Sequence, residues 1–286
     1  MSLKIYKNTK VFIISPVSSI TGGIESLHQL GYNLRNRLGI ETYIYYYPDI
    51  SLKVEQEETR YNVPYIQKIA DEHSNILIIP EIFTNLDTIN NFKNIRKVVW
   101  WLSIDNYFLS LLSLKHGFLL QRGINKISNF LFKKPVYNLP IILQNDIYKL
   151  SDFLKKDKVV QEASLHLVQS EYAKNYLLKS DIREDILYYL SDYINESFLN
   201  RPFNLEEKKD FVVYNHRKGY FFTRHIMQHS SGIKFIPLLN MDRAQVITTL
   251  SEAKVYIDFG THPGKDKPPR EAAIMGCCVI TGKRGS

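Results

Sequence analysis

The chain has 286 residues, of which 44% are hydrophobic and 23% charged, as in a soluble globular protein of one large or two ordinary domains. Its formal net charge of +8 favours an anionic partner, which could be a nucleotide phosphate, an anionic membrane surface or nucleic acid. No apolar run is long enough to span a bilayer, and the first residues do not resemble a signal peptide. The adjacent Cys277 and Cys278 are too close for an ordinary disulfide and lack zinc-site spacing, so we expect core packing in a reducing compartment.

The first two thirds of the chain alternate short apolar runs with helical patterns. Leucines recur at helical spacing after Gly22-Gly23, and a second helix is expected to open at Ser170. Uninterrupted apolar strands separated by helices are typical of a parallel sheet that is covered on both faces. The predicted strands are 11–14, 42–47, 76–79, 98–102, 165–169 and 186–190.

A second alternation follows the polar segment 202–210, which we interpret as a linker. The sequence therefore predicts an α/β protein with two doubly wound domains, residues 1–200 and 201–286. The second domain is short and stops in a Gly-rich loop, so we expect it to be incomplete. Its predicted strands are 211–214, 233–237, 255–258 and 277–280, and its predicted helices are 219–228, 242–252 and 269–275.

The loop after strand 255–258 carries the strongest functional pattern. Gly260 and Gly264 let the backbone approach a ligand closely, and the next helix directs its free N–H groups at the loop. In that helix, Glu271 is expected in the first turn, where it reaches ligand hydroxyls, and Arg270 is expected to pair with a carboxylate or phosphate. The alternative is a Pro-Gly turn before a helix whose acid merely complements the helix dipole.

This stretch resembles the C-terminal motif of GT-B glycosyltransferases of the family 4 type. In that family a Gly-rich loop precedes Glu-Ala, a small residue and a glycine, which correspond here to Glu271, Ala272, Ala273 and Gly276. The resemblance implies a GT-B fold, in which two Rossmann-like domains face a cleft. It further implies an acceptor-binding first domain and a second domain that binds a nucleotide-sugar donor.

The resemblance also implies roles for single residues of this loop. Glu271 would hold the donor ribose, and the loop backbone would contact the donor sugar and phosphates. That part of the loop comprises His262, Pro263, Gly264 and Lys265. The family often has a further Glu where this chain has Pro263, so His262 or Asp266 would have to replace it.

Two other turns fit the same resemblance. In the turn after strand 211–214, Arg217 and Lys218 match the family's cations for the donor diphosphate, and Asn215 belongs to the same turn. The alternative is a solvated basic turn. Gly22 and Gly23 resemble the Gly-Gly loop that faces the phosphates and the acceptor, although a plain helix start needs the same residues. Residues 167–173 resemble the family's strand-Ser-helix segment.

Polar residues after strand 98–102 are candidates for the acceptor site. Asp105 could orient or deprotonate an acceptor hydroxyl, or it could cap the next helix. His28 and His116 are weaker candidates, because a histidine on a helix is more often structural.

Residues 107–134 form a basic and apolar stretch with an amphipathic helical pattern. Such a helix can lie in an anionic membrane surface, or it can cover the sheet with its basic face in water. A membrane contact would suit an enzyme that acts on a lipid-linked or envelope glycan.

The sequence thus predicts a glycosyltransferase of bacterial cell-surface glycan synthesis, moving a sugar from a nucleotide-sugar donor to a glycan or lipid-linked acceptor. The resemblance implies retention of configuration, no metal and no cofactor, and no Asp-x-Asp motif follows a strand. The alternative is a non-catalytic glycosyltransferase-like module, favoured by Pro263 and the early end. A nucleic-acid partner is not expected, because no recognition motif is present. We expect a cytoplasmic location, with peripheral attachment to the inner face of the membrane as an alternative.

Overall fold

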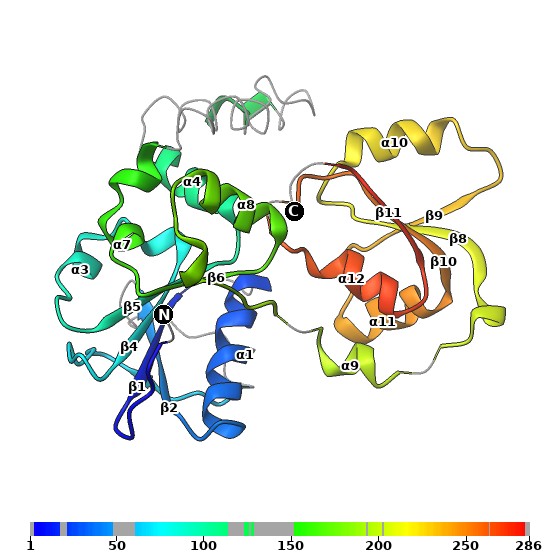
Figure 1. The fold of residues 1–286 in the computed structure, drawn as a ribbon. Coiled ribbons are helices and arrows are strands. Elements are labelled where there is room, and N and C mark those ends of the chain that lie inside the picture. The colour runs from blue at the N-terminus through cyan, green and yellow to red at the C-terminus, as the bar shows by residue number, and fades with distance from the viewer. Residues whose placement is uncertain are drawn as a thin grey trace. The chain divides into compact units, whose positions relative to one another are not determined.

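The structure is a computed structural model that describes residues 3–17, 22–47, 61–113, 123–125, 127–128, 152–192, 194–201, 203–262 and 264–283. The chain forms two compact units, Met1–Asp192 and Tyr193–Ser286 (Figure 1). Each unit is an open parallel sheet with its own hydrophobic core, as the sequence predicts.

The first unit contains a seven-stranded parallel sheet in the order β3-β2-β1-β4-β5-β6-β7. Because β1 lies between β2 and β4, the strand order reverses there, and this is the switch point of the sheet. The strands are β1 (Lys10–Pro16), β2 (Glu41–Tyr47), β3 (Tyr65–Ile66), β4 (Ile76–Pro80), β5 (Arg96–Trp101), β6 (Leu165–Val168) and β7 (Leu187–Tyr189).

Successive apolar side chains of these strands enter two separate cores, which confirms that both faces are covered. Ile13 packs in one core with Leu27 of α1 (Gly22–Asn36). Phe12, its neighbour in β1, packs in the other core with Phe108 and Leu177. This second face is covered by α3 (Asp87–Asn90), α4 (Ile104–Ser113), α7 (Lys158–Gln161) and α8 (Glu171–Lys179) (Figure 1).

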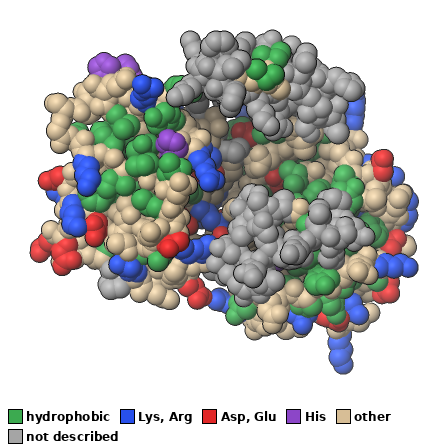
Figure 2. Space-filling view, turned by 180° about the vertical axis from the view of Figure 1, so that it is seen from behind, with side chains coloured by type: hydrophobic (Ala, Val, Ile, Leu, Met, Phe, Trp, Pro, Cys, Tyr) green, Lys and Arg blue, Asp and Glu red, His purple; other side chains and the backbone are tan. Residues whose placement is uncertain are grey.

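The second unit contains a four-stranded parallel sheet in the order β11-β10-β8-β9. Its core lies against α9, α11 and α12, with Phe198, Leu250, Tyr256 and Met275 fully or almost fully buried. Figure 2 shows hydrophobic side chains exposed on this unit. The elements are α9 (Glu196–Leu199), β8 (Lys209–Tyr214), α10 (Tyr220–Gln228), β9 (Lys234–Pro237), α11 (Arg243–Glu252), β10 (Ala253–Asp258), α12 (Lys267–Ile274) and β11 (Cys278–Thr281).

The segment 194–210 differs from the predicted linker. Lys209 and Asp210 already belong to β8, and residues 205–207 form a short 3-10 helix. Ile194 and Phe198 are buried in the second core, so the compact second unit starts eight residues before the predicted boundary at 200/201. The polar composition of 202–210 concealed these apolar anchors just before it.

The predicted membrane-contact stretch lies mostly outside the described residues. Its first part belongs to α4, where Tyr107 and Phe108 are fully buried in the core and do not form an exposed apolar surface. Residues 114–122, 126 and 129–134 are outside the described part of the chain. Among the helices of the described residues, none has the length and apolar character needed to cross a bilayer.

A buried lysine closes one end of the second core. The Lys208 ammonium donates hydrogen bonds to the carbonyls of Leu250 and Ala253, at 3.1 and 2.7 Å, where α11 ends. Leu250 lies in the last turn of α11, whose carbonyls lack partners within a helix, and Ala253 is the residue that follows the helix. A cation is favourable at this negative end of the helix dipole. The Cys277 thiol donates to the same two carbonyls at 3.2 and 3.3 Å.

Lys208→Met keeps most of the apolar stem but removes the ammonium, so it should lower the free energy of unfolding by about 1–3 kcal/mol. Its neighbour Lys209 is the matched control, since it makes only an exposed ion pair with Glu252. Lys209→Met should cost less than about 1 kcal/mol. Urea unfolding measures both, and equal losses in the two variants would contradict the capping role.

Candidate functional site

The buried carboxylate of Asp258 lies at the switch point of the second sheet, between β8 and β10. Its Oδ2 accepts a hydrogen bond from Asn215 Nδ2 at 2.8 Å, and its Oδ1 accepts one from the Gly260 N–H at 3.0 Å. Asn215 follows β8 and Gly260 follows β10. Asp258 therefore ties together two loops, 215–219 and 259–266, which we call the switch-point loops. Ligands of open α/β sheets bind at such a position.

Two glycines let the switch-point loops touch. Gly219 has φ +63°, and a Cβ there would lie 2.4 Å from the carbonyl carbon of Phe259. A Cβ on Gly260 would lie 2.3 Å from the Cβ of Lys218. Neither position has room for a larger residue, so glycine sets the close approach of the loops.

A group of charges lies across this junction. The Lys218 ammonium and the His262 ring both bond Asp266 Oδ2, with His262 Nδ1 at 2.9 Å. His262 is 5% exposed. The hydrogen bond to Asp266 and the nearby charge of Asp258 raise the pKa of His262, although burial opposes this. Burial alone would raise the pKa of Asp266. The hydrogen bonds from His262 and Lys218 together outweigh burial, so the pKa of Asp266 lies below its usual value.

Asp258, His262 and Asp266 offer metal-ligand atoms within 4.8 Å of one another. The two ring nitrogens nevertheless face different carboxylates: Nδ1 faces Asp266, and Nε2 lies 4.0 Å from Asp258 Oδ1. A metal ion bound to one ring nitrogen would therefore be near only one of the two carboxylates. Because Lys218 already bonds Asp266, the arrangement fits an imidazolium and an ammonium better than a metal.

The remaining predicted cations differ in their surroundings. Arg217 is exposed, its backbone N–H bonds Asn215 Oδ1 at 3.0 Å, and no carboxylate of the described residues forms an ion pair with its side chain. Arg270 donates to the backbone carbonyls of Asp266 and Lys265, at 3.2 and 3.1 Å. Its guanidinium thus closes the turn before α12. Lys265 is exposed and Gly264 partly exposed, whereas Pro263 lies outside the described residues.

The helix start in this region differs from the expectation. α12 begins at Lys267, so Glu271 lies in the second turn, and its predicted first-turn position is wrong. Pro268 and Pro269 occupy the first turn, where their missing N–H groups break no helical bond. The same two prolines leave this helix end with few free N–H donors, so anion binding here depends more on side-chain cations than expected.

In the first unit, Asp105 lies in the first turn of α4 and accepts a hydrogen bond from the Tyr172 hydroxyl at 2.9 Å. Burial raises the pKa of its carboxyl. A capping bond at this helix start comes from Ser103, whose Oγ accepts from the Asn106 N–H at 3.1 Å. Gly22 and Gly23 open α1, the helix that follows β1 in the chain.

The surroundings of His28 are those of a structural residue. Its ring nitrogens contact the Ile24 carbonyl and the Tyr46 hydroxyl, both at 2.9 Å, and the ring is buried. The other histidine candidate, His116, lies outside the described residues.

Sequence reasoning missed Glu81, which follows β4 at the switch point of the first sheet. The carboxyl is 2% exposed and accepts a hydrogen bond from the Leu102 N–H at 3.0 Å, joining the ends of β4 and β5. Burial raises the pKa of Glu81 to about 8, so the group is mostly neutral at pH 7. The available signal was an acidic residue directly after a wholly apolar strand, Ile76–Pro80.

Solved structures with the same arrangement of elements are glycosyltransferases. Anabaena HepE in complex with UDP-glucose superposes with a TM-score of 0.56 at 11% identity, over 96% of this chain and 81% of that one. Sucrose-phosphate synthase from Thermosynechococcus elongatus gives 0.54 at 12% identity, over 97% and 82%. The chain has the GT-B fold. At such identities the likeness establishes the fold and no more.

Sequence comparisons add little to the GT-B assignment. No family model matches the chain. A curated match, the DNA-directed RNA polymerase subunit beta' of Oedogonium cardiacum, is 30% identical over 176 residues. It involves 58% of this chain but only 9% of that protein, so the chain spans a small fraction of the polymerase subunit.

The buried Glu81 should make stability depend on pH. Its pKa is higher in the folded state than the ordinary 4.5, so its stabilising contribution is complete below about pH 4.5 and is lost as the pH rises to about 8. The loss should reach about 1.4 kcal/mol per pH unit. Glu81→Gln is neutral throughout, so urea unfolding from pH 5 to 8 should show the wild type losing stability relative to this variant. Exposed Glu72→Gln is the control and should retain the wild-type slope. If Glu81→Gln also retained that slope, the assignment would be contradicted.

The charges of the switch-point loops can be tested by titrating His262. Asp266→Asn replaces the carboxylate with a neutral amide, so the pKa of His262 should fall. Imidazole NMR signals followed against pH measure this. Asp210→Asn, which alters an exposed pair with Lys254, should leave the pKa of His262 unchanged. An unchanged value in Asp266→Asn would show that Asp266 does not hold the imidazolium.

Proposed function

We propose that the protein is a glycosyltransferase that moves a sugar from a nucleotide-sugar donor to a hydroxyl acceptor. The observation that supports the proposal is the meeting of Lys218 and the imidazole of His262 at the switch point of the second sheet, with Arg217 in the same loop as Lys218. Cations at this position suit a diphosphate. The fold supports the same conclusion, since HepE, which shares it, is bound to UDP-glucose.

The charge balance supports diphosphate binding in the second unit. Arg217 has no carboxylate partner among the described residues, so a donor phosphate would supply the missing charge. Lys218 is shared with Asp266, and a bound diphosphate would compete for its ammonium. In the reaction, the bond from the anomeric carbon to the diphosphate oxygen breaks, and its electrons pass to the diphosphate. These cations would stabilise that developing charge.

We assign the donor ribose to Glu271, in line with the family resemblance. Glu271 lies in α12, whose start is fixed by the turn that Arg270 closes. The sugar and phosphates are assigned to the backbone of residues 262–265. Since Arg217 and Lys218 can neutralise the diphosphate, the proposed mechanism uses no metal. Retention of configuration is proposed from the family resemblance.

We place the acceptor at the carboxyl edge of the first sheet. The raised pKa of Asp105 suits a carboxyl that takes a proton from an acceptor hydroxyl as the new bond to the anomeric carbon forms. The acceptor is proposed to be a glycan or a lipid-linked glycan of the bacterial cell surface. Peripheral attachment through residues 107–134 and a cytoplasmic location belong to the same proposal.

Two observations favour a non-catalytic module that binds a donor without turning it over. Lys218 is neutralised by Asp266, and Pro263 replaces an acid that is common in the family. Donor binding without transfer or donor hydrolysis by the full chain would support this second candidate.

Thermal-shift titrations with UDP-, GDP- and dTDP-sugars test donor binding. At least one should raise the melting temperature of the wild type, with or without EDTA. Both Glu271→Ala and Arg217→Gln should lower the affinity for that donor at least tenfold, or by about 1.4 kcal/mol, because each removes a proposed ligand contact. Glu252→Ala removes an acid from an exposed pair and serves as the control.

Transfer to acceptor hydroxyls and slow donor hydrolysis are then measured with the donor that binds. A folded wild type that no nucleotide sugar stabilises would refute the proposal. Loss of binding on EDTA treatment would refute its metal-free form.

A further inference from the structure

The first unit contains a polar pocket at the amino ends of its strands, opposite the carboxyl edge of the sheet. The cavity has a volume of about 600 Å³. Arg96 begins β5, Ser164 precedes β6 and Ile186 precedes β7, so these lining residues lie at the amino ends of parallel strands. The length of β5, six residues, puts about 20 Å between this edge and the start of α4, where Asp105 lies.

Two cations meet at one end of this pocket. The Lys4 ammonium lies 5.1 Å from the centroid of the Tyr6 ring, and the Arg96 guanidinium lies 4.9 Å from the same centroid. In the described part of the chain, no carboxylate forms an ion pair with either side chain. Two like charges beside one ring repel each other, and an anion placed between them would relieve that repulsion.

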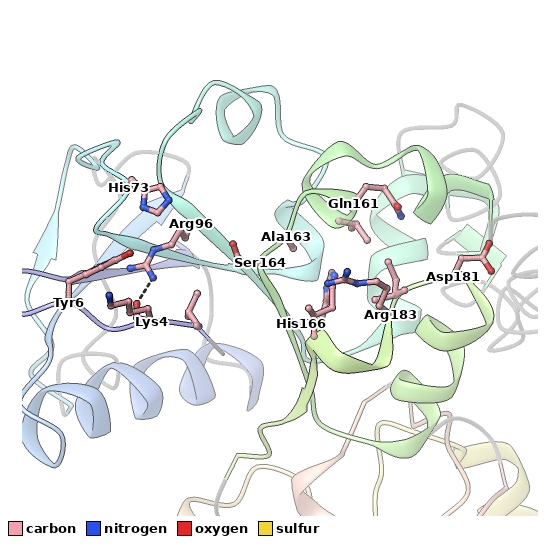
Figure 3. A pocket seen from close by; sticks show the side chains of 14 residues that line it. Lys4, Tyr6, His73, Arg96, Gln161, Ala163, Ser164, His166, Asp181 and Arg183 are labelled. Carbon is pink, nitrogen blue, oxygen red and sulfur yellow. Dashed lines mark hydrogen bonds between the residues drawn. The ribbon is translucent and has the colours of Figure 1, made fainter. Parts of the chain in front are cut away.

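The guanidinium of Arg96 is held in place rather than free to turn away. It donates one hydrogen bond to the carbonyl of Lys4 and another to the carbonyl of Ser74, the latter at 2.6 Å. These bonds use neutral acceptors, so the positive charge stays uncompensated. Figure 3 shows Lys4, Tyr6, His73 and Arg96 gathered on one side of Ser164.

The other side of the pocket carries little free charge. Asp181 pairs with Lys155 at 2.6 Å, and Arg183 pairs with Asp185 at 3.2 Å. His166 is neutral, because its Nδ1 accepts a hydrogen bond from the Trp101 indole at 3.1 Å and burial lowers its pKa to about 4. The uncharged lining includes Gln161 and Ser164, which can bond hydroxyl groups, beside Val160, Ala163 and Ile182 (Figure 3).

We propose that this pocket binds a small phosphorylated polyhydroxy compound, of the sugar-phosphate class, as an effector. The phosphate lies between Lys4 and Arg96, and the hydroxyl-bearing body extends over Ser164 towards Gln161. The volume is in the range of small-ligand sites and exceeds what a lone phosphate needs. Because the pocket is far from the carboxyl edge of its sheet, its ligand is not a reactant of the proposed transfer.

Isothermal titration of the full chain tests this, with glucose 6-phosphate, glucose and inorganic phosphate as probes. Glucose 6-phosphate should bind at least tenfold more tightly than inorganic phosphate, and glucose should not bind measurably. Lys4→Gln should lower the affinity for glucose 6-phosphate at least tenfold. The Lys4 side chain makes no hydrogen bond or ion pair within the described residues, so this variant should fold normally. Arg37→Gln removes an exposed cation that does not line the pocket and should leave binding unchanged.

The proposal would be overturned by no binding of glucose 6-phosphate, by unchanged affinity in Lys4→Gln, or by equal affinity for inorganic phosphate. Glu271→Ala separates this site from the proposed donor site: it should bind glucose 6-phosphate like the wild type. Loss of binding in Glu271→Ala would place the ligand in the second unit and refute the pocket assignment, whatever the outcome for nucleotide sugars.

Discussion

The candidate site of the second unit depends on one buried carboxylate. Asp258 ends β10 and has hydrogen bonds from both switch-point loops, through Asn215 and Gly260. Parallel strands bring the ends of β8 and β10 to the same edge, but they do not fix the loops that follow. The Asp258 bonds do so, and the tight contact at Gly219 leaves the loops little freedom. The backbone of the loops that carry the cations is therefore held in place before any ligand arrives.

Much of the GT-B architecture could be predicted from the sequence, because its strands are uninterrupted apolar runs with helical spacing between them. Ile76–Pro80 and Arg96–Trp101 are almost entirely buried, as that pattern requires. The start of α12 was missed because two prolines look like a helix boundary, yet both fit inside the first turn. Likewise, polar residues 202–210 looked like a linker, although Phe198 just before them anchors the chain in the second core.

The site itself was less predictable, because its chemistry arises between residues distant in sequence. Lys218 reads as a free phosphate-binding cation, but it bonds Asp266, 48 positions later. His262 gains a raised pKa from the same carboxylate. Glu81 appears as an ordinary acid, and only its burial beside the end of β5 makes it neutral at pH 7. Residue type and spacing suggest which loops matter, whereas the charge state of each group depends on packing.

Hydrogen–deuterium exchange of the full chain, with and without the stabilising nucleotide sugar, would locate the bound donor. We expect slower exchange in residues 214–219 and 258–274, with smaller changes along the amino edge of the first sheet. Protection that is confined to the first unit, or absent at a saturating donor concentration, would contradict the assignment of the donor to the switch-point loops.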